Sequence, residues 1–63
     1  MKKKELVNLA KKFAKFEKII STSEDAAEVQ KAQEEIMKLS KNISNFEDLI
    51  AIDEMVMEIL ENS

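Results

Sequence analysis

The sequence predicts an all-α fold, a small three-helix bundle with helices over about residues 3–20, 24–42 and 45–61. In each segment the apolar residues recur three and four positions apart, which is the periodicity of an amphipathic helix. Gly and Pro are both absent, and only short polar stretches separate the three segments. Because short connections favour antiparallel neighbouring helices, we expect residues 1–63 to form a single helical domain.

The first predicted helix has an apolar side and a basic side. Its apolar stripe consists of Leu6, Leu9, Phe13, Phe16 and Ile20. Four lysines fall together on the opposite side: Lys4, Lys11, Lys15 and Lys18. This distribution predicts a helix that packs its stripe into a core and leaves its lysines in solvent.

A cluster of hydroxyl and acidic residues, 21–25, marks the start of the second helix. Any of its three hydroxyls can serve as the N-cap, and Ser21 with Glu24 has the spacing of a capping box. The helix that follows, over 24–42, has a narrow apolar face in which Ala32 allows a neighbour to approach closely. That face consists of Val29, Ala32, Ile36, Leu39 and Ile43.

The third predicted helix carries more apolar surface than the other two. Ser44 with Glu47 again has the capping-box spacing, so we place the start of this helix at Asn45. Ten of the fifteen residues in 46–60 are apolar. By helical geometry they cover roughly 220° of arc, whereas packing against two neighbouring helices needs about 140°.

The excess divides into two flanks, and only one of them is needed for the core of a monomer. The flanks are Leu49, Ile52, Val56 and Ile59 on one side, and Phe46, Ile50 and Met57 on the other. A leftover apolar stripe of this kind is typical of an interface. We therefore predict a protein interface on this helix, formed by Phe46, Leu49, Ile50, Ile52, Asp53, Val56, Met57 and Ile59.

Asp53 is the unusual residue of this surface, because it lies inside the apolar arc. A buried carboxylate without a partner is costly, so this one is paired, protonated or exposed. Paired with a lysine of the first helix or of another chain, it would fix the register of an association. If the fold exposes this part of the arc, Asp53 is simply solvated.

The length of the chain supports association independently. A chain of 63 residues buries only about 60% of its unfolded surface, and small domains usually add disulfides, a metal or a partner. With no Cys and no His, a partner is the remaining device. We expect a second copy or a helix of another protein, including dimerisation into a larger bundle by exchange of the third helix.

Charge is divided along the chain and suggests an alternative function. Residues 1–20 carry seven lysines and two acids, whereas residues 44–63 carry six acids and no lysine. The stripe of Lys4, Lys11, Lys15 and Lys18 would attract nucleic acid or an anionic membrane surface. The net charge of −3 and the absence of Arg, Tyr and Trp argue against both. The stripe is more simply explained as a solvated face that balances the acidic third helix.

The composition excludes most catalytic chemistries, so we expect a non-enzymatic protein with no catalytic, metal or cofactor-binding residues and no small-molecule substrate. Ser and Thr have no His to act as a base, there is no Cys nucleophile, and there is no Gly-rich phosphate loop. The carboxylate pair Glu54 and Glu58 would need a concave pocket to act as acid and base. No signal peptide or membrane-spanning segment is evident, so the cytoplasm is the expected location. The spacing and the caps are generic to helical bundles and identify no family.

Overall fold

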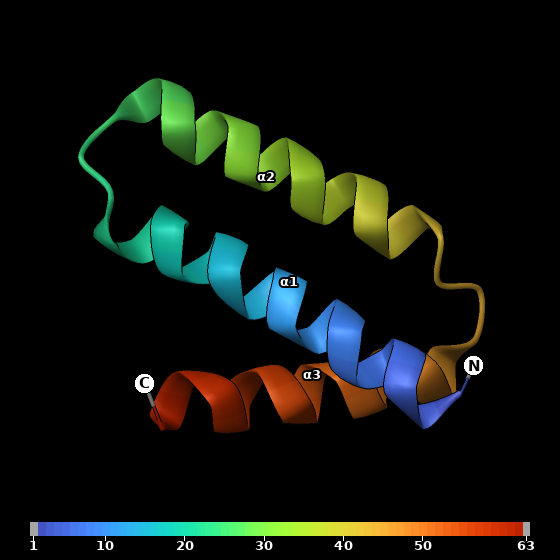
Figure 1. Ribbon diagram of the computed structural model, residues 1–63. Helices are drawn as coiled ribbons and strands as arrows, with labels where there is room; N and C mark the ends of the chain where they lie inside the picture. Colours follow the sequence, from blue (N-terminus) through green and yellow to red (C-terminus); the bar gives the residue numbers. More distant parts are fainter. Residues whose placement is uncertain (1, 63) are drawn as a thin grey trace.

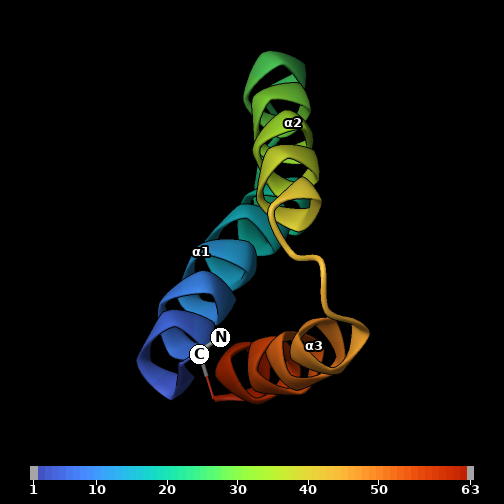
Figure 2. The same cartoon turned by 90° about the vertical axis from the view of Figure 1, so that its right-hand side faces the viewer.

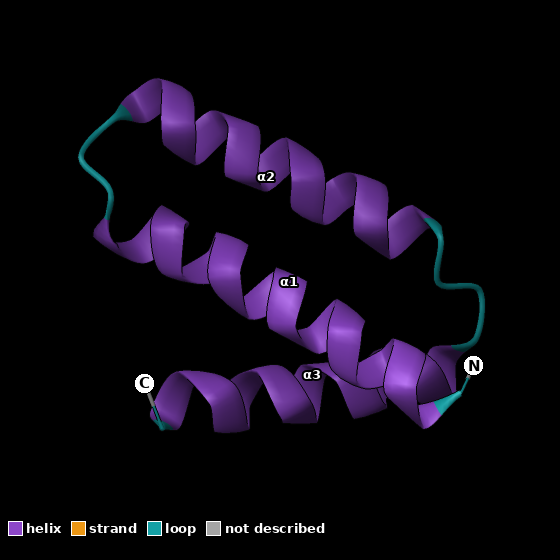
Figure 3. Ribbon diagram, in the orientation of Figure 1, coloured by secondary structure: helices purple, strands orange, loops and turns teal. Residues whose placement is uncertain are grey.

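The computed structural model describes residues 2–62 and confirms the predicted all-α fold. Its helices are α1 (Lys3–Thr22), α2 (Ala26–Lys41) and α3 (Phe46–Glu61), and no strand occurs between residues 2 and 62 (Figure 3). In Figure 1, α2 returns antiparallel to α1, and α3 runs in the same general direction as α1. No helix of this described part is long and apolar enough to cross a membrane.

The first connection differs from the predicted capping arrangement. The Ser21 and Thr22 hydroxyls both donate to the Lys18 carbonyl, at 3.0 and 2.7 Å, so they belong to the end of α1. The N-cap of α2 is Asp25, whose carboxylate accepts a 3.0 Å hydrogen bond from the Ala27 amide. The prediction that a hydroxyl caps this helix was therefore wrong. A carboxylate is an equally good cap and also favours the positive end of the helix dipole.

The second connection also moves its cap by one residue. The Asn45 side chain accepts a 2.9 Å hydrogen bond from the Glu47 amide, so Asn45 is the N-cap and α3 begins at Phe46. The predicted Ser44 cap was wrong because Asn is at least as good a cap and stands directly before the helix. Neither connection contains a residue of positive φ within the described chain, which agrees with a sequence that has no Gly.

The arrangement of the three helices is open, because α1 packs against both of the others while α2 and α3 barely touch each other. Figure 2 shows α2 and α3 diverging from the connection between them, with α1 lying beside both. The principal-axis extents of the molecule are 34 × 26 × 15 Å, so one dimension is much shorter than the other two. The helices therefore form a shallow bundle with α1 at its centre.

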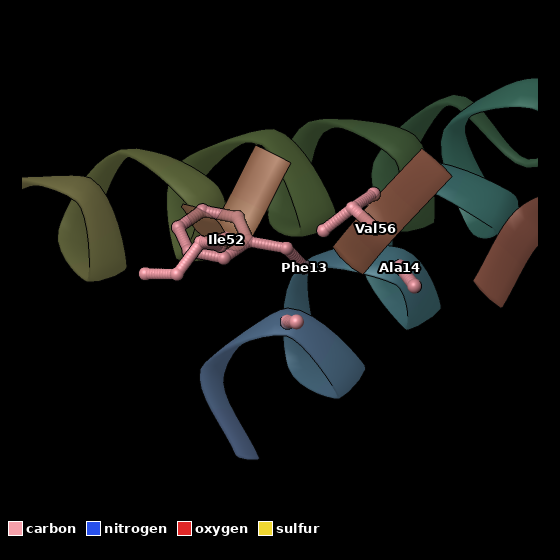
Figure 4. Close-up of a cluster of buried hydrophobic side chains, with 5 residues drawn as sticks. Phe13, Ala14, Ile52 and Val56 are labelled. Carbon is pink, nitrogen blue, oxygen red and sulfur yellow. The ribbon is translucent and has the colours of Figure 1, made fainter. Parts of the chain in front are cut away.

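The core lies mainly where α1 meets α3. Small residues of α1 allow the close approach, and large residues of α3 fill the space over them. The buried cluster consists of Ala10, Phe13, Ala14, Ile52 and Val56 (Figure 4). On α2 the buried residue is Ala32, which is the close-approach position predicted from the sequence. No polar or charged residue is buried in residues 2–62, so packing of apolar side chains holds the fold together.

Candidate protein-binding groove

The two predicted flanks of α3 have different environments. Ile52 and Val56 are 2% and 4% exposed and pack against α1, with Ile59 half-buried beside them. Ile52 and Val56 were included in the predicted interface, but in this structure they belong to the core of the monomer. The reason is that α3 needs one flank to attach itself to α1, and Ile52 and Val56 form one buried cluster with residues of α1.

The other flank of α3 is in solvent. Phe46 is 72% exposed, Met57 58% and Ile50 46%, and Leu49 at the boundary between the flanks is 40% exposed. Asp53 is exposed as well, and no ion pair joins it to another residue in the part of the chain that the structure describes. Of the two alternatives for Asp53, the structure therefore shows the solvated one.

A groove of about 210 Å³ lies where α2 and α3 diverge over α1. All three helices contribute to its lining, with Phe13 and Glu17 from α1, Ile36 and Ser40 from α2, and Leu49, Ile52, Asp53 and Val56 from α3. The groove exists because α2 and α3 each use α1 as their packing surface and leave the space between themselves open. Its lining is predominantly apolar, which is typical of a surface that binds another apolar surface.

The exposed apolar residues continue the groove outward on both sides. Successive residues of a helix are rotated by about 100°, which allows their directions to be compared with those of the lining residues. On α2, Met37 follows Ile36 and Ser40 in the same rotational direction, away from α1. On α3, the solvent-exposed flank follows Leu49 and Asp53 in the corresponding direction. Of the five large exposed hydrophobic residues, Leu49 lines the groove itself. By helical rotation the other four lie beyond the lining, and we call the groove together with these residues the trough: Met37, Phe46, Ile50 and Met57.

The charge of this trough is negative. Two carboxylates, Glu17 and Asp53, are among its lining residues, and no lysine is. Beyond the exposed flank of α3, the next helical positions are occupied by Glu47, Glu54 and Glu61. The sequence of α3 contains no basic residue that would offset them. An apolar surface with an acidic edge results.

The predicted lysine stripe lies on another side of α1. Lys11, Lys15 and Lys18 border a shallow hollow of about 300 Å³ whose apolar floor is made by Ala14, Ile59 and Leu60. Lys4 is not among the lining residues, so the structure brings three of the four predicted lysines together around one hollow. On α1 these lysines are rotated by roughly 100° or more from Phe13 and Glu17, so the hollow and the groove are separate surfaces.

No group of three or more acidic residues within 2–62 is placed to hold a metal ion. An ion pair within α2, from Lys38 Nζ to Glu35 Oε1 at 3.7 Å, is exposed. Glu54 and Glu58 are both exposed, and neither lines the groove.

Sequence reasoning missed the contributions of α1 and α2 to this surface. It treated Phe13 and Ile36 as core residues and did not single out Glu17. Glu17 carried the same signal as Asp53, because it lies four residues after Phe13 on the apolar side of its helix. Glu17 and Asp53 each lie within or beside an apolar stripe. An acidic residue at such a position indicates the part of the stripe that is exposed to solvent.

Comparison of the chain with protein-family models, with curated proteins and with solved structures finds no match, so its function has to be inferred from its own surface.

Proposed function

We propose that this chain is a non-enzymatic protein-interaction module that binds an amphipathic helix in the groove between α2 and α3. The observation that carries the proposal is the separation of α2 from α3, which leaves an apolar groove lined by all three helices. The five large exposed hydrophobic residues all belong to α2 and α3, the two helices that form its walls. Scattered single hydrophobic residues on a surface are ordinary, but a continuous apolar patch on a small domain is typical of an interaction site.

A helix suits the trough because its walls are themselves helices. A fourth helix between α2 and α3 would rest on Phe13 and convert the shallow bundle into a four-helix bundle. Recognition of this kind uses apolar anchors at positions i, i+3 or i+4, and i+7 of the bound helix. Met37 of α2 and Met57 of α3 are both exposed on the helices that form the walls, and Met side chains adapt readily to the shape of a partner.

The exposed apolar surface is large enough to support binding. Fully burying a large apolar side chain contributes about 1.5–3 kcal/mol, so covering five roughly half-exposed ones contributes on the order of 5 kcal/mol. The apolar stripe of the partner contributes a comparable amount. Together these exceed the lower estimates of the cost of association, about 4 kcal/mol, and we expect weak to moderate affinity.

The methionine methyl groups provide a direct test. The probe is a synthetic amphipathic helical peptide with a leucine stripe, titrated into the chain labelled with ¹³C at its methionine methyls. We expect the Met37 and Met57 signals to shift together, because both side chains are exposed and they belong to the two helices that form the walls of the groove. Met55 is half-buried on the opposite side of α3 and serves as the internal control. A shift of Met57 without Met37 would mean binding to α3 alone and would contradict the groove.

A double variant, Ile50→Gln with Met57→Gln, tests the same site by affinity. Both residues are exposed, so the variant should keep its helical circular dichroism and lose at least tenfold in peptide affinity. Ala27→Gln, on the exposed outer face of α2, is the matched control and should bind as the unmodified chain does. Equal binding by all three proteins would refute the proposed site.

The alternative function, binding of nucleic acid or an anionic membrane surface, stays a prediction for the other side of α1. The observation in its favour is the gathering of Lys11, Lys15 and Lys18 around one hollow. Binding that weakens steeply with salt and is lost in the Lys11→Gln, Lys15→Gln, Lys18→Gln triple variant would support it. Absence of binding at low salt would end it.

A further inference from the structure

Building on the proposed function, we infer that the helix bound in the groove is basic and comes from another protein. Its apolar stripe would be flanked by lysine or arginine residues, which face the acidic edge of the trough. The class of partner is thus an amphipathic helix of positive charge, and a second copy of this chain does not belong to that class.

The first argument is the position of the charges inside the groove. Glu17 on α1 and Asp53 on α3 line the same space from two helices, with apolar side chains around them. A helix that covers these side chains removes part of their solvent. Carboxylates that lose solvent need a charge or a hydrogen-bond donor in return, and a long basic side chain supplies both while its aliphatic stem covers apolar surface.

The second argument is the charge around the groove. Residues 44–63, which include α3, carry six acids and no base. On α2 the positions beyond the groove are close to neutral, with Gln33 near the edge and Lys41 and Glu34 farther out. The α3 side of the trough therefore attracts a basic ligand from a distance, and the α2 side does not oppose it.

A second copy of this chain is a poor occupant of the groove, because its charge has the wrong sign. A symmetric dimer through the groove would bring two acidic α3 helices together and place like charges opposite each other, which is penalised. The basic helix of the chain, α1, cannot serve as the ligand, because its apolar stripe already forms the core of the monomer. Its free side carries Lys11, Lys15 and Lys18.

The test compares two synthetic helical peptides that share one leucine stripe and differ at the flanking positions, lysine in one and glutamate in the other. Affinity for the whole chain is measured by fluorescence anisotropy at about 0.1 M and about 1 M salt, where the Debye length falls from about 10 Å to 3 Å. We expect the lysine peptide to bind about tenfold more tightly at the lower salt. At the higher salt the two affinities should converge while apolar binding persists.

A charge-matched pair of variants assigns the preference to the groove. Glu17→Gln with Asp53→Asn should reduce the lysine preference to about threefold or less, since the remaining acids lie farther out. The control is Glu24→Gln with Glu58→Gln, which makes the same change in net charge in the first connection and on the far side of α3. This control should keep most of the preference.

The outcomes separate the inference from the proposed function. If neither peptide binds at either salt concentration, the proposed function fails and the inference fails with it. If both peptides bind equally, or the glutamate peptide binds better, the groove binds helices but the inference about charge is overturned. A dimer in sedimentation at high micromolar concentration, with Met37 and Met57 signals that move as the protein is diluted, would make a second copy the occupant and also overturn the inference.

Discussion

The two flanks of α3 make a direct comparison, because one helix of one composition presents both. Ile52 and Val56 are almost fully buried, while Ile50 and Met57, at neighbouring positions along the same helix, are about half exposed. Neither hydrophobicity nor helix propensity separates the two sets. The difference comes from what lies opposite: α1 covers one flank, and α2 stands too far away to cover the other.

The size of α1 limits how much apolar surface this fold can bury. Both α2 and α3 rest on α1, and they are joined by a connection that lets them diverge. A closed three-helix bundle would require contact between α2 and α3. The chain therefore keeps a predominantly apolar groove between α2 and α3.

The largest effect we predict comes from making the same substitution on each flank. Ile52→Ala should lower the free energy of unfolding by about 2–4 kcal/mol, because it leaves a cavity in the small core between α1 and α3. Ile50→Ala should change it by less than about 1 kcal/mol, since that side chain is already half in solvent and Ala is a good helix former. Urea unfolding followed by circular dichroism measures both.

Equal destabilisation by Ile50→Ala and Ile52→Ala would mean that both flanks are buried within the monomer. That result would remove the trough and with it the basis for a partner. A dependence of the Ile50→Ala effect on protein concentration would instead show that association covers this flank.

A second substitution tests the close contact that buries the first flank. Ala10 has no exposed surface and lies in the cluster with Ile52 and Val56, so Ala10→Leu has no room for three additional carbon atoms. We expect a loss of about 1–3 kcal/mol from overpacking. The same change on the outer face of α2, Ala27→Leu, should stay within about 0.5 kcal/mol, and thermal unfolding of the two variants compares them. If Ala10→Leu were stabilising, α1 and α3 would not be in close contact at this point.

The helix caps should have the next largest effect, and they test how α3 is placed over α1. Asn45→Ala removes the 2.9 Å hydrogen bond to the Glu47 amide and should cost about 1 kcal/mol. Ser44→Ala should cost little, because the capping bond predicted for that residue is made by Asn45 instead. A larger loss from Ser44→Ala than from Asn45→Ala, in urea unfolding, would restore the capping box and contradict the structure.

Sequence periodicity was sufficient to predict the three helices and their inner faces. The stripes of α1 and α2 are regular, and the residues named for these two stripes are all buried or half-buried in the structure. The caps were predicted less well, because Ser, Thr, Asp and Asn have similar capping strengths and stand side by side in both connections. Which of the neighbouring polar residues becomes the N-cap depends on the path of the backbone through the connection. The spacing of apolar residues does not predict that path.

The groove could be predicted only in part. Counting the arc of α3 indicated that one flank would be left over, and it also indicated which residues form each flank. Which flank is covered depends on the angle between α2 and α3, and helix positions in one segment carry no information about that angle. For the same reason Phe13, Glu17 and Ile36 were not recognised as one surface before the structure brought them together.

The smallest effect on stability that we predict is at Asp53. This residue lies on the exposed side of α3, so its substitution tests whether that side contributes to the stability of the monomer. Asp53 is exposed and has no ion pair in the described chain, so Asp53→Asn should change the free energy of unfolding by less than about 0.5 kcal/mol. Glu54→Gln, at the next and equally exposed position, is the control and should behave alike. Breaking a buried ion pair would cost about 3–5 kcal/mol, so a loss of that size in Asp53→Asn would place this carboxylate inside the fold. Suppose that Asp53→Asn leaves the free energy of unfolding unchanged but weakens the preference for the lysine peptide. The Asp53 carboxylate would then contribute to partner binding and not to the stability of the monomer.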